Sequence, residues 1–132
     1  MIFVDADFFI GIVSHVDAHH VRAVEILERV RSRGESLITS WDVIDEVSTK
    51  LSYYISKELA KDFLGFMASS DIQVEYADKV VSEAAKKIFL SFKSKKISMT
   101  DCVNMALANK HKIKRFLSFD KHYLKGGFEL VA

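Results

Sequence analysis

Four acidic residues stand at positions in this sequence where a carboxylate can do chemistry. Asp5 and Asp120 follow short apolar runs of the kind that form buried strands. Glu46 falls at the border of the apolar face of a predicted helix, and Asp101 falls in the first turn of another. Clustered carboxylates repel one another unless they are protonated or bridged by a cation. Oxygen ligands without clustered histidine or cysteine favour magnesium or manganese, which activate water for phosphodiester hydrolysis.

Each of these acids also has an ordinary structural explanation. Ser98 and Asp101 match a capping box at the start of a helix, where the backbone dipole favours an acid. Asp120 fits a turn after a strand, Asp5 fits a helix cap, and Glu46 fits a solvated surface. The argument for a site therefore depends on the four acids meeting at one edge of the molecule. We expect no lysine or arginine beside them.

Short apolar segments alternate with amphipathic helices along the whole chain. The expected strands are Ile2 to Val4, Ser36 to Thr39, Ile72 to Tyr76, Phe116 to Phe119 and Phe128 to Val131. The expected helices are Phe8 to Val13, Ala18 to Arg31, Ser40 to Tyr54, Lys57 to Ala68, Asp78 to Phe89 and a last one that begins at Ser98. This alternation predicts a three-layer α/β/α domain around a mainly parallel sheet of about five strands. In such sheets ligand sites lie beyond the carboxyl ends of the strands, so Asp5 and Asp120 should share one edge.

The helices that carry the other two acids differ in character. The helix after Ser98 has almost no polar face, which predicts that it is buried all round. Asp101 and Asn104 share one stripe of that helix and can therefore act together. The inward residues expected on the earlier helices are Val21, Val24, Leu27 and Val30 on one, and Val43, Ile44, Val47, Leu51 and Tyr54 on the next.

Composition limits the class of protein. A chain of 132 residues fits a single domain, residues 1–132, and 49% apolar with 28% charged residues is typical of a soluble globular protein. The net charge of +1 is too small for a protein that holds nucleic acid by a broad basic field alone. One cysteine, Cys102, excludes an intrachain disulfide. No signal peptide or apolar run of about 20 residues is present, so we expect a cytoplasmic location and no membrane partner.

Four short motifs, taken in order, make the chain resemble PIN-domain proteins and, among them, the VapC-type toxin ribonucleases. They are IFVDADFFI with Asp5, SWDVIDEVSTKL with Glu46, ISMTDCVNMALA with Asp101 and RFLSFDKHYL with Asp120. The resemblance covers nearly the whole chain and implies a PIN-like fold with Mg²⁺ or Mn²⁺ held by these four acids. It also implies an endoribonuclease that is the toxin of a toxin–antitoxin pair. The expected partners are an RNA substrate, a small antitoxin protein and further copies of the chain in a homodimer or higher homo-oligomer.

Three further residues are candidates for accessory roles. Ser118 stands where the family often has a threonine or serine, and it could hydrogen-bond to Asp5 or act as a plain strand residue. Asp7 is either an accessory acid or an ordinary helix N-terminal charge, and Asn104 shares the stripe of Asp101. His122 falls where some family members carry a further acid or an asparagine, which leaves the number of metals open.

Several other groups have both a structural and a functional interpretation. Seven basic residues flank the acidic stretch near the C-terminus and could together guide an RNA backbone, although each alone fits a solvated surface: Lys93, Lys95, Lys96, Lys110, Lys112, Lys114 and Arg115. The histidines His15, His19 and His20 border an apolar helix face, so we interpret them as structural residues and not as metal ligands. An aromatic cluster is mostly core, with a part that could be exposed for dimerisation or a partner helix: Tyr53, Tyr54, Phe63, Phe66 and Met67.

Two other functions are compatible with parts of the sequence. The tetrapeptide that contains Asp5 and Asp7 resembles the D-x-D start of haloacid-dehalogenase-type phosphatases, in which Asp5 would be the nucleophile and Asp7 a general acid. That interpretation leaves Glu46 and Asp101 without a role. The sequence after Asp7 also lacks the residue that usually completes the phosphatase motif. A non-catalytic RNA-binding or assembly module with the same fold is the third possibility, and the presence of all four acids argues against it.

Overall fold

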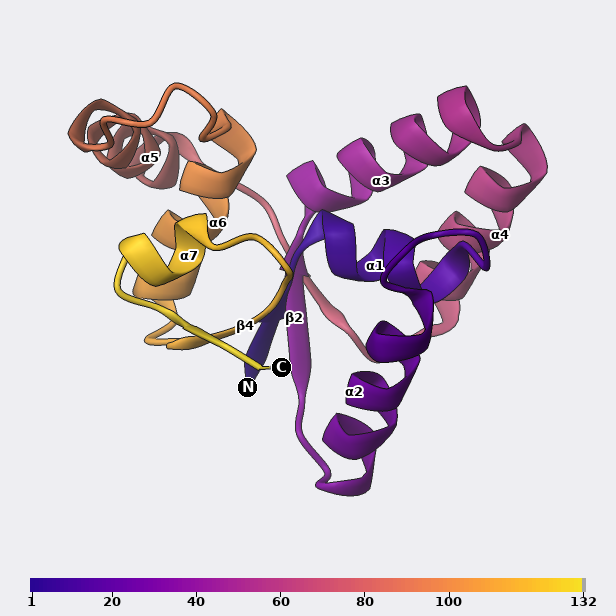
Figure 1. Ribbon diagram of the computed structural model, residues 1–132. Coiled ribbons are helices and arrows are strands. Elements are labelled where there is room, and N and C mark those ends of the chain that lie inside the picture. Colours follow the sequence, from indigo (N-terminus) through magenta and orange to yellow (C-terminus); the bar gives the residue numbers. More distant parts are fainter. Residues whose placement is uncertain (132) are drawn as a thin grey trace.

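A parallel sheet of five short strands forms the middle layer of the protein in the computed structural model, which describes residues 1–131 (Figure 1). The strands are β1 (Ile2–Val4), β2 (Leu37–Ser40), β3 (Gln73–Glu75), β4 (Arg115–Leu117) and β5 (Glu129–Leu130). Their order across the sheet is β3-β2-β1-β4-β5, and every neighbouring pair is parallel. Residue 132, the last of the predicted domain, lies outside the described residues.

Helices cover both faces of this sheet. They are α1 (Ala6–Val13), α2 (His20–Ser32), α3 (Trp41–Tyr54), α4 (Lys57–Ser69), α5 (Lys79–Ser91), α6 (Met99–Lys110) and α7 (His122–Lys125). The first four lie on one side of the sheet and the last three on the other (Figure 1). The predicted three-layer α/β/α fold with a parallel sheet is therefore confirmed. Among the described residues, no helix is both long and apolar enough to cross a membrane.

The central strand β1 follows directly from its sequence. Its three residues are all fully buried, as expected for a continuous apolar run with a helical layer on each side. Strand β3 lies at the edge of the sheet and is partly exposed, which agrees with its alternating sequence. Four of the five strands differ in their bounds from the prediction, and two of these differences affect the site, because β2 extends to Ser40 and β4 already ends at Leu117. Ser118, Phe119 and Asp120 therefore form a loop beyond the end of β4.

Three predicted N-caps are confirmed, whereas α1 begins at Ala6 and not at Phe8, and α2 begins at His20 and not at Ala18. The side chains of Ser40, Asp78 and Ser98 each accept a hydrogen bond from the backbone N–H three residues later, as N-caps do. The burial of α6 is confirmed as well, since eight consecutive residues from Asp101 to Ala108 are buried. Caps and apolar runs are local patterns, which is why the sequence located them correctly.

The inward face of α2 was predicted correctly only in part, since Val30 is buried and Leu27 packs against the core as expected. Ala23, Ile26 and Val30 are buried, whereas Val21 is 70% exposed. The cause is a close approach between helices, because a Cβ atom placed on Gly11 of α1 would lie only 3.1 Å from the Cβ atom of Ala23. A small residue forms this contact, and a search for large apolar side chains misses it.

Two features near helix ends were also unexpected. Tyr54 was predicted on the inward face of α3 but is 82% exposed, because the last buried residue of this helix is Leu51. The single-turn helix α7 was not predicted. It places the fully buried ring of Tyr123 against Phe116, with the ring centroids 4.1 Å apart. Such a short helix has no periodic pattern that a sequence could reveal.

Candidate functional site

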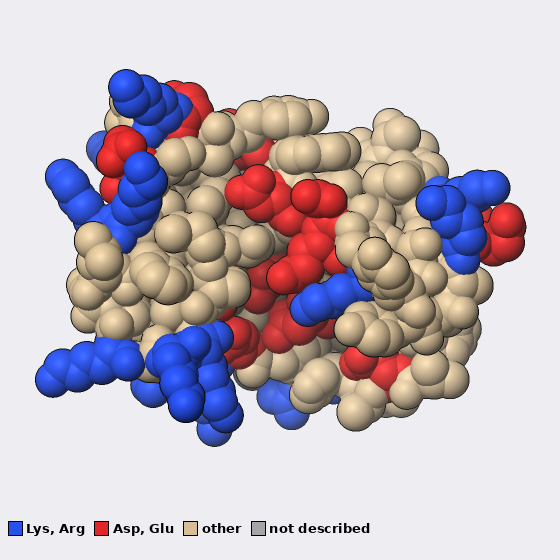
Figure 2. Space-filling view, turned by 90° about the horizontal axis from the view of Figure 1, so that it is seen from above, with Lys and Arg blue, Asp and Glu red and all other residues tan. Residues whose placement is uncertain are grey.

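The four predicted acids meet in one cleft at the edge of the sheet where the parallel strands end. Figure 2 looks onto this edge and shows acidic side chains gathered in a hollow between the two halves of the molecule. The cleft has a volume of about 300 Å³ and is lined by Asp5, Asp7, Ile10, Asp17, His19, Glu46, Lys50, Ser98, Asp101 and Asp120. The structure thus brings all four acids together, while their catalytic role remains a prediction.

Asp5 is the most buried of these acids. Its backbone N–H donates to the carbonyl of Leu117 at 3.0 Å, which fixes the end of β1 against β4. Its carboxylate is 4% exposed and accepts hydrogen bonds from Asn104 Nδ2 at 3.3 Å and Ser118 Oγ at 3.1 Å. The predicted hydrogen bond from Ser118 to Asp5 is therefore present. Both donors are neutral, so they fix the carboxylate without balancing its charge.

The side-chain amide of Asn104 lies at the centre of the site. Its Oδ1 accepts a hydrogen bond from Ser40 Oγ at 2.8 Å, and its Nδ2 donates to Asp5 and to the hydroxyl of Tyr123 at 3.1 Å. The Tyr123 hydroxyl in turn donates to Asp101 Oδ1 at 3.4 Å. One buried amide therefore connects β1, β2, α6 and α7. The sequence indicated Asn104 as a neighbour of Asp101 but gave no indication of Tyr123.

Asp101 has two roles at once. Its Oδ2 accepts from the backbone N–H of Ser98 at 3.1 Å, and its own N–H donates to Ser98 Oγ at 3.0 Å, which completes the capping box. Its Oδ1 receives the hydrogen bond from Tyr123. The capping explanation and the site explanation were treated as alternatives, yet they are compatible, because Asp101 caps α6 and also lines the cleft.

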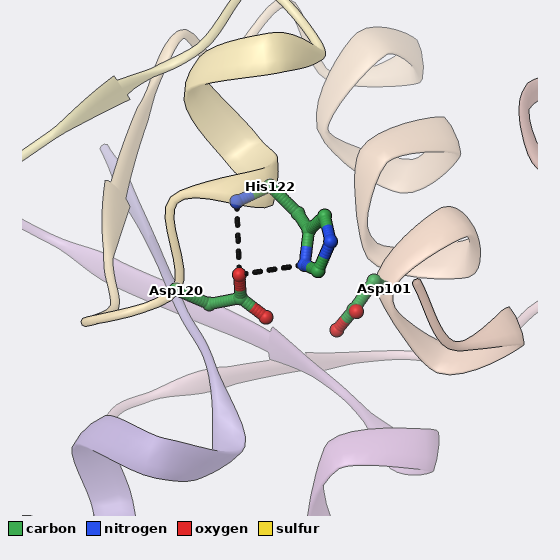
Figure 3. Close-up of side chains that lie close together, drawn as sticks. All are labelled: Asp101, Asp120 and His122. Atoms are coloured by element: carbon green, nitrogen blue, oxygen red, sulfur yellow. Dashed lines mark hydrogen bonds and ion pairs between the residues drawn. The ribbon is translucent and has the colours of Figure 1, made fainter. Parts of the chain in front are cut away.

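Asp120 faces Asp101 across the cleft (Figure 3). Its Oδ1 accepts from the backbone N–H of His122 at 2.8 Å and lies 2.8 Å from the Nδ1 atom of the same residue. One ligand atom from each of Asp101, Asp120 and His122 lies within 4.8 Å of the other two, close enough to hold a single metal ion. The expectation of a cluster without histidine is therefore wrong, because α7 turns His122 back toward Asp120.

Glu46 reaches the cleft from α3 and does not stand alone there. The Nζ atom of Lys50 lies 3.8 Å from Glu46 Oε1, and both side chains line the cleft. We expected no lysine near the acids. This prediction is wrong, because Lys50 follows Glu46 by four residues and residues at this spacing share one side of a helix. The pair is partly exposed, so its contribution to stability is small. Among the described residues that line the cleft, Lys50 is the only lysine or arginine.

Two other side chains shape the loop that carries Asp120. Asp7 accepts hydrogen bonds from the backbone N–H of Phe119 at 2.9 Å and from Ser118 Oγ at 3.2 Å. The ring of His19 stacks on Phe119, with centroids 4.1 Å apart and planes 9° apart. Asp7 therefore fixes the loop after β4. His19, which the sequence gave no functional role, forms part of the cleft wall.

The electrostatic environment disfavours simultaneous ionisation of these acids. Burial raises the pKa of Asp5 well above its usual value, and the nearby charges of Asp7 and Asp101 raise it further. Burial is also the main cause of the raised pKa of Asp101, to which Asp120 adds, and of the raised pKa of Glu46. A proton or a bound cation relieves this repulsion. Carboxylate oxygens at this spacing fit Mg²⁺ or Mn²⁺.

A larger hollow elsewhere on the molecule contains none of the four acids. It has a volume of about 460 Å³ and is lined mainly by apolar side chains, among them Phe8, Phe9, Leu27 and Phe66. Volume alone would therefore point to the wrong place. The chemistry of the lining residues identifies the smaller acidic cleft as the candidate site.

The basic residues near the acidic stretch do not form one group. Arg115 is the first residue of β4, so it lies at the ends of the strands opposite the cleft. Its guanidinium forms two hydrogen bonds to the carboxylate of Glu35. Lys110 ends α6, about 16 Å along the helix axis from its start. Lys93, Lys95 and Lys96 precede Ser98, the residue that caps the acidic end of α6, but they do not line the cleft.

Comparison with known proteins gives one consistent family. The family model described as the PIN domain matches residues 2–129. Ribonuclease VapC13 of Mycobacterium tuberculosis is 24% identical over 123 residues, which cover 93% of this chain and 92% of the relative. The crystal structure of VapC20 from the same organism, described as a toxin that cleaves the sarcin-ricin loop, has a TM-score of 0.86 at 23% identity and covers 97% of this chain and 96% of its own. FitAcB from Neisseria gonorrhoeae has a TM-score of 0.74 at 14% identity, with 100% and 97% covered.

The metal-free protein should lose stability as the pH rises from about 4 toward neutrality. Because burial raises the pKa of Asp5 in the folded state, the folded protein holds this proton more tightly than the unfolded chain. That stabilisation is complete below the unfolded pKa of about 3.9 and is lost as the pH rises through the folded pKa. In urea titrations, the unfolding free energy of the wild type should fall on the order of 1 kcal/mol more than that of Asp5→Asn. An identical pH dependence in both proteins would contradict the assignment.

Tyr123→Phe should weaken the site while keeping the core ring. The substitution removes the hydroxyl that links Asn104 to Asp101 and should cost about 1 kcal/mol of stability. Loss of an outer hydrogen-bond partner should also lower the affinity for Mn²⁺ by about 10-fold or more, measured by calorimetry. Tyr53→Phe is the matched control, because its side chain is exposed. Equal Mn²⁺ affinity in both variants would show that the hydroxyl does not support the site.

Proposed function

Because this chain belongs to the PIN-domain family, we propose that it is a divalent-metal-dependent endoribonuclease and the toxin of a toxin–antitoxin pair. The observation that carries the proposal is the convergence of Asp5, Glu46, Asp101 and Asp120 on one cleft. These residues come from β1, α3, α6 and the loop after β4, so no local structural need explains their meeting. The relatives named as VapC ribonucleases support RNA as the substrate class.

We assign the metal to Asp101, Asp120 and His122, whose ligand atoms lie within 4.8 Å of one another, and to Asp5 in the same cleft, with Glu46 at the border of the site. When bound, Mg²⁺ or Mn²⁺ would polarise a phosphoryl oxygen and lower the pKa of a water molecule. The protein holds its ligand oxygens in place beforehand, since Asn104 and the residues bonded to it fix the carboxylates of Asp5 and Asp101. Such outer hydrogen bonds orient metal ligands and tune their basicity.

Two residues of α3 complete the proposed chemistry. Burial raises the pKa of Glu46, which makes its carboxylate a stronger proton acceptor for the attacking water. Lys50 offers a cation inside an otherwise acidic cleft and can meet the phosphate of the substrate. Its contact with Glu46 is long at 3.8 Å and partly exposed, so Lys50 can exchange this partner for a phosphate at little cost.

The phosphatase alternative explains less of the structure. It uses Asp5 and Asp7, yet Glu46, Asp101 and Asp120 line the same cleft and would have no role. Asp7 is also engaged by the backbone of Phe119, which fixes the loop after β4. A non-catalytic RNA-binding module would likewise leave the clustered acids without a purpose. The nuclease proposal accounts for all of them.

We further propose a small antitoxin partner, self-association and a cytoplasmic location. The α3–α4 hairpin supports a protein contact, because Tyr53 and Tyr54 at the end of α3 are each 82% exposed. Residues 1–132 would act as one domain, since β1 and β5, near the two ends of the chain, belong to one sheet.

Asp101→Asn and Asp120→Asn should each lower RNA cleavage by about a hundredfold or more. Each substitution removes one charged ligand oxygen that stabilises the reaction electrostatically. The measurement is cleavage of total RNA with Mg²⁺ or Mn²⁺, with and without a chelator. Asp62→Asn, an exposed acid on α4, is the matched control and should cleave like the wild type. Cleavage that survives chelation, or that survives both site substitutions, would sink the nuclease proposal.

Purification under native conditions from cells of its source should yield the chain together with a small protein. We expect RNA cleavage to be low in this complex and to appear once the small protein is removed by denaturation and refolding of the chain. The readout is the composition of the complex by mass spectrometry and the cleavage rate before and after separation. A fully active chain that purifies alone would argue against the toxin–antitoxin assignment and leave the nuclease chemistry intact.

A further inference from the structure

Two exposed aromatic side chains form a stacked pair at the same edge of the sheet as the acidic cleft. The rings of Trp41 and Tyr76 have centroids 6.0 Å apart and planes 14° apart. Trp41 is 46% exposed and Tyr76 is 65% exposed. A stacked pair that served only the core would be covered by other side chains. These two rings contribute little to the core, so their arrangement calls for a different explanation.

The topology places this pair in line with the acids. Trp41 directly follows Ser40, the last residue of β2, and Tyr76 directly follows Glu75, the last residue of β3. Strand β2 lies beside β1, whose last residue directly precedes Asp5, and β3 lies beyond β2. Neighbouring strands are about 4.8 Å apart, so the aromatic pair lies one and two strands away from Asp5 along a single edge.

A series of side-chain hydrogen bonds also links the segment that carries Trp41 to the acids. Ser40 Oγ donates to Asn104 Oδ1, and Asn104 Nδ2 donates to Asp5. Ser40 also caps α3, whose first residue is Trp41. The aromatic pair and the acidic cleft therefore belong to one rigid frame. This arrangement suits two parts of one binding surface for an extended ligand.

The charges around the pair indicate which part of a nucleotide it can bind. Asp42 follows Trp41 in the chain, and the exposed Asp45 lies one helical turn further along α3. Carboxylates at these positions repel a phosphate. A nucleobase is uncharged, and every base has a flat face that can stack on an aromatic ring. In a duplex the faces of the bases are covered, so the ligand must be single-stranded.

We propose that Trp41 and Tyr76 form a stacking platform for a base of single-stranded RNA that flanks the scissile phosphate in the acidic cleft. This inference rests on the proposed nuclease function and adds the position of the strand, which runs from the acids toward β3. Stacking tolerates any base, so the platform sets the strandedness of the substrate and not its sequence. Its removal affects substrates long enough to reach it.

Trp41 is the only tryptophan of the chain, so its fluorescence reports directly on the platform. The probe is a pool of ten-nucleotide single-stranded RNAs of random sequence, added with Mg²⁺ to Asp120→Asn protein so that the RNA stays intact. We expect the RNA to quench Trp41 and Tyr76→Ala to lower the affinity about tenfold. Tyr76→Phe, which keeps the ring, should bind like the parent protein. Tyr53→Ala removes an exposed aromatic ring elsewhere and should also have no effect.

A second readout uses the active protein. Tyr76→Ala should raise the KM for the ten-nucleotide pool about tenfold with kcat unchanged, because the platform binds a part of the substrate that does not react. A ten-nucleotide chain of abasic ribose phosphates has no base to stack on the pair, so Tyr76→Ala should leave both of its constants at their wild-type values. Tyr76→Phe should restore the KM of the RNA pool.

The outcomes separate the two proposals. If RNA is cleaved but Trp41 is not quenched, or if Tyr76→Ala keeps wild-type affinity and KM, the platform is overturned and the nuclease stands. Quenching by a co-purified protein partner and not by RNA would overturn it as well. If RNA quenches Trp41 but no form of the protein cleaves RNA, the platform stands as an RNA-binding surface and the nuclease proposal is wrong.

Discussion

The hydrogen bond from the Asn104 amide to the buried carboxylate of Asp5 is the interaction on which the rest of the site depends. An amide offers a donor and an acceptor on one planar group, and here the acceptor serves Ser40 while the donor serves Asp5 and Tyr123. An aspartate at this position would add another negative charge and could not donate to Asp5 unless it were protonated. A buried polar group is costly unless its partners are in place, so each residue of this network fixes the others.

Burying several carboxylates together provides ligands for a cation but lowers the stability of the metal-free protein. The carboxylates have raised pKa values because burial and mutual repulsion disfavour their charged forms. A protein selected only for stability would replace Asp5 and Asp101 by neutral groups of the same shape. Sites that bind cations accept this cost, since the ion restores the balance of charge when it is bound. The neutral donors Asn104 and Ser118 keep the carboxylates oriented without competing with a cation for the charge.

The sequence predicted those parts of the molecule that depend on neighbouring residues. An apolar run followed by an acid located β1 and Asp5, and the parallel-sheet rule placed Asp5 and Asp120 at one edge. What it missed depends on contacts between distant segments. Tyr123 enters the site from a helix of a single turn, which has no periodicity to detect. The inward face of α2 is set by the close approach of Gly11 to Ala23, and no count of large apolar residues reveals such a contact.

Different kinds of side chain follow different strands at the carboxyl ends of the sheet. Their positions relative to one another follow from how a parallel sheet is built. The segments that follow β1 and β4 carry the acids Asp5 and Asp120, whereas the residues that directly follow β2 and β3 are Trp41 and Tyr76. A parallel sheet presents all of its strand ends on one side, so residues far apart in sequence become neighbours in the order of the strands. Acids that can hold a cation and aromatic faces that can stack on bases can then lie side by side along one line. A single fold thereby offers a surface that matches the alternating chemistry of a nucleic-acid strand.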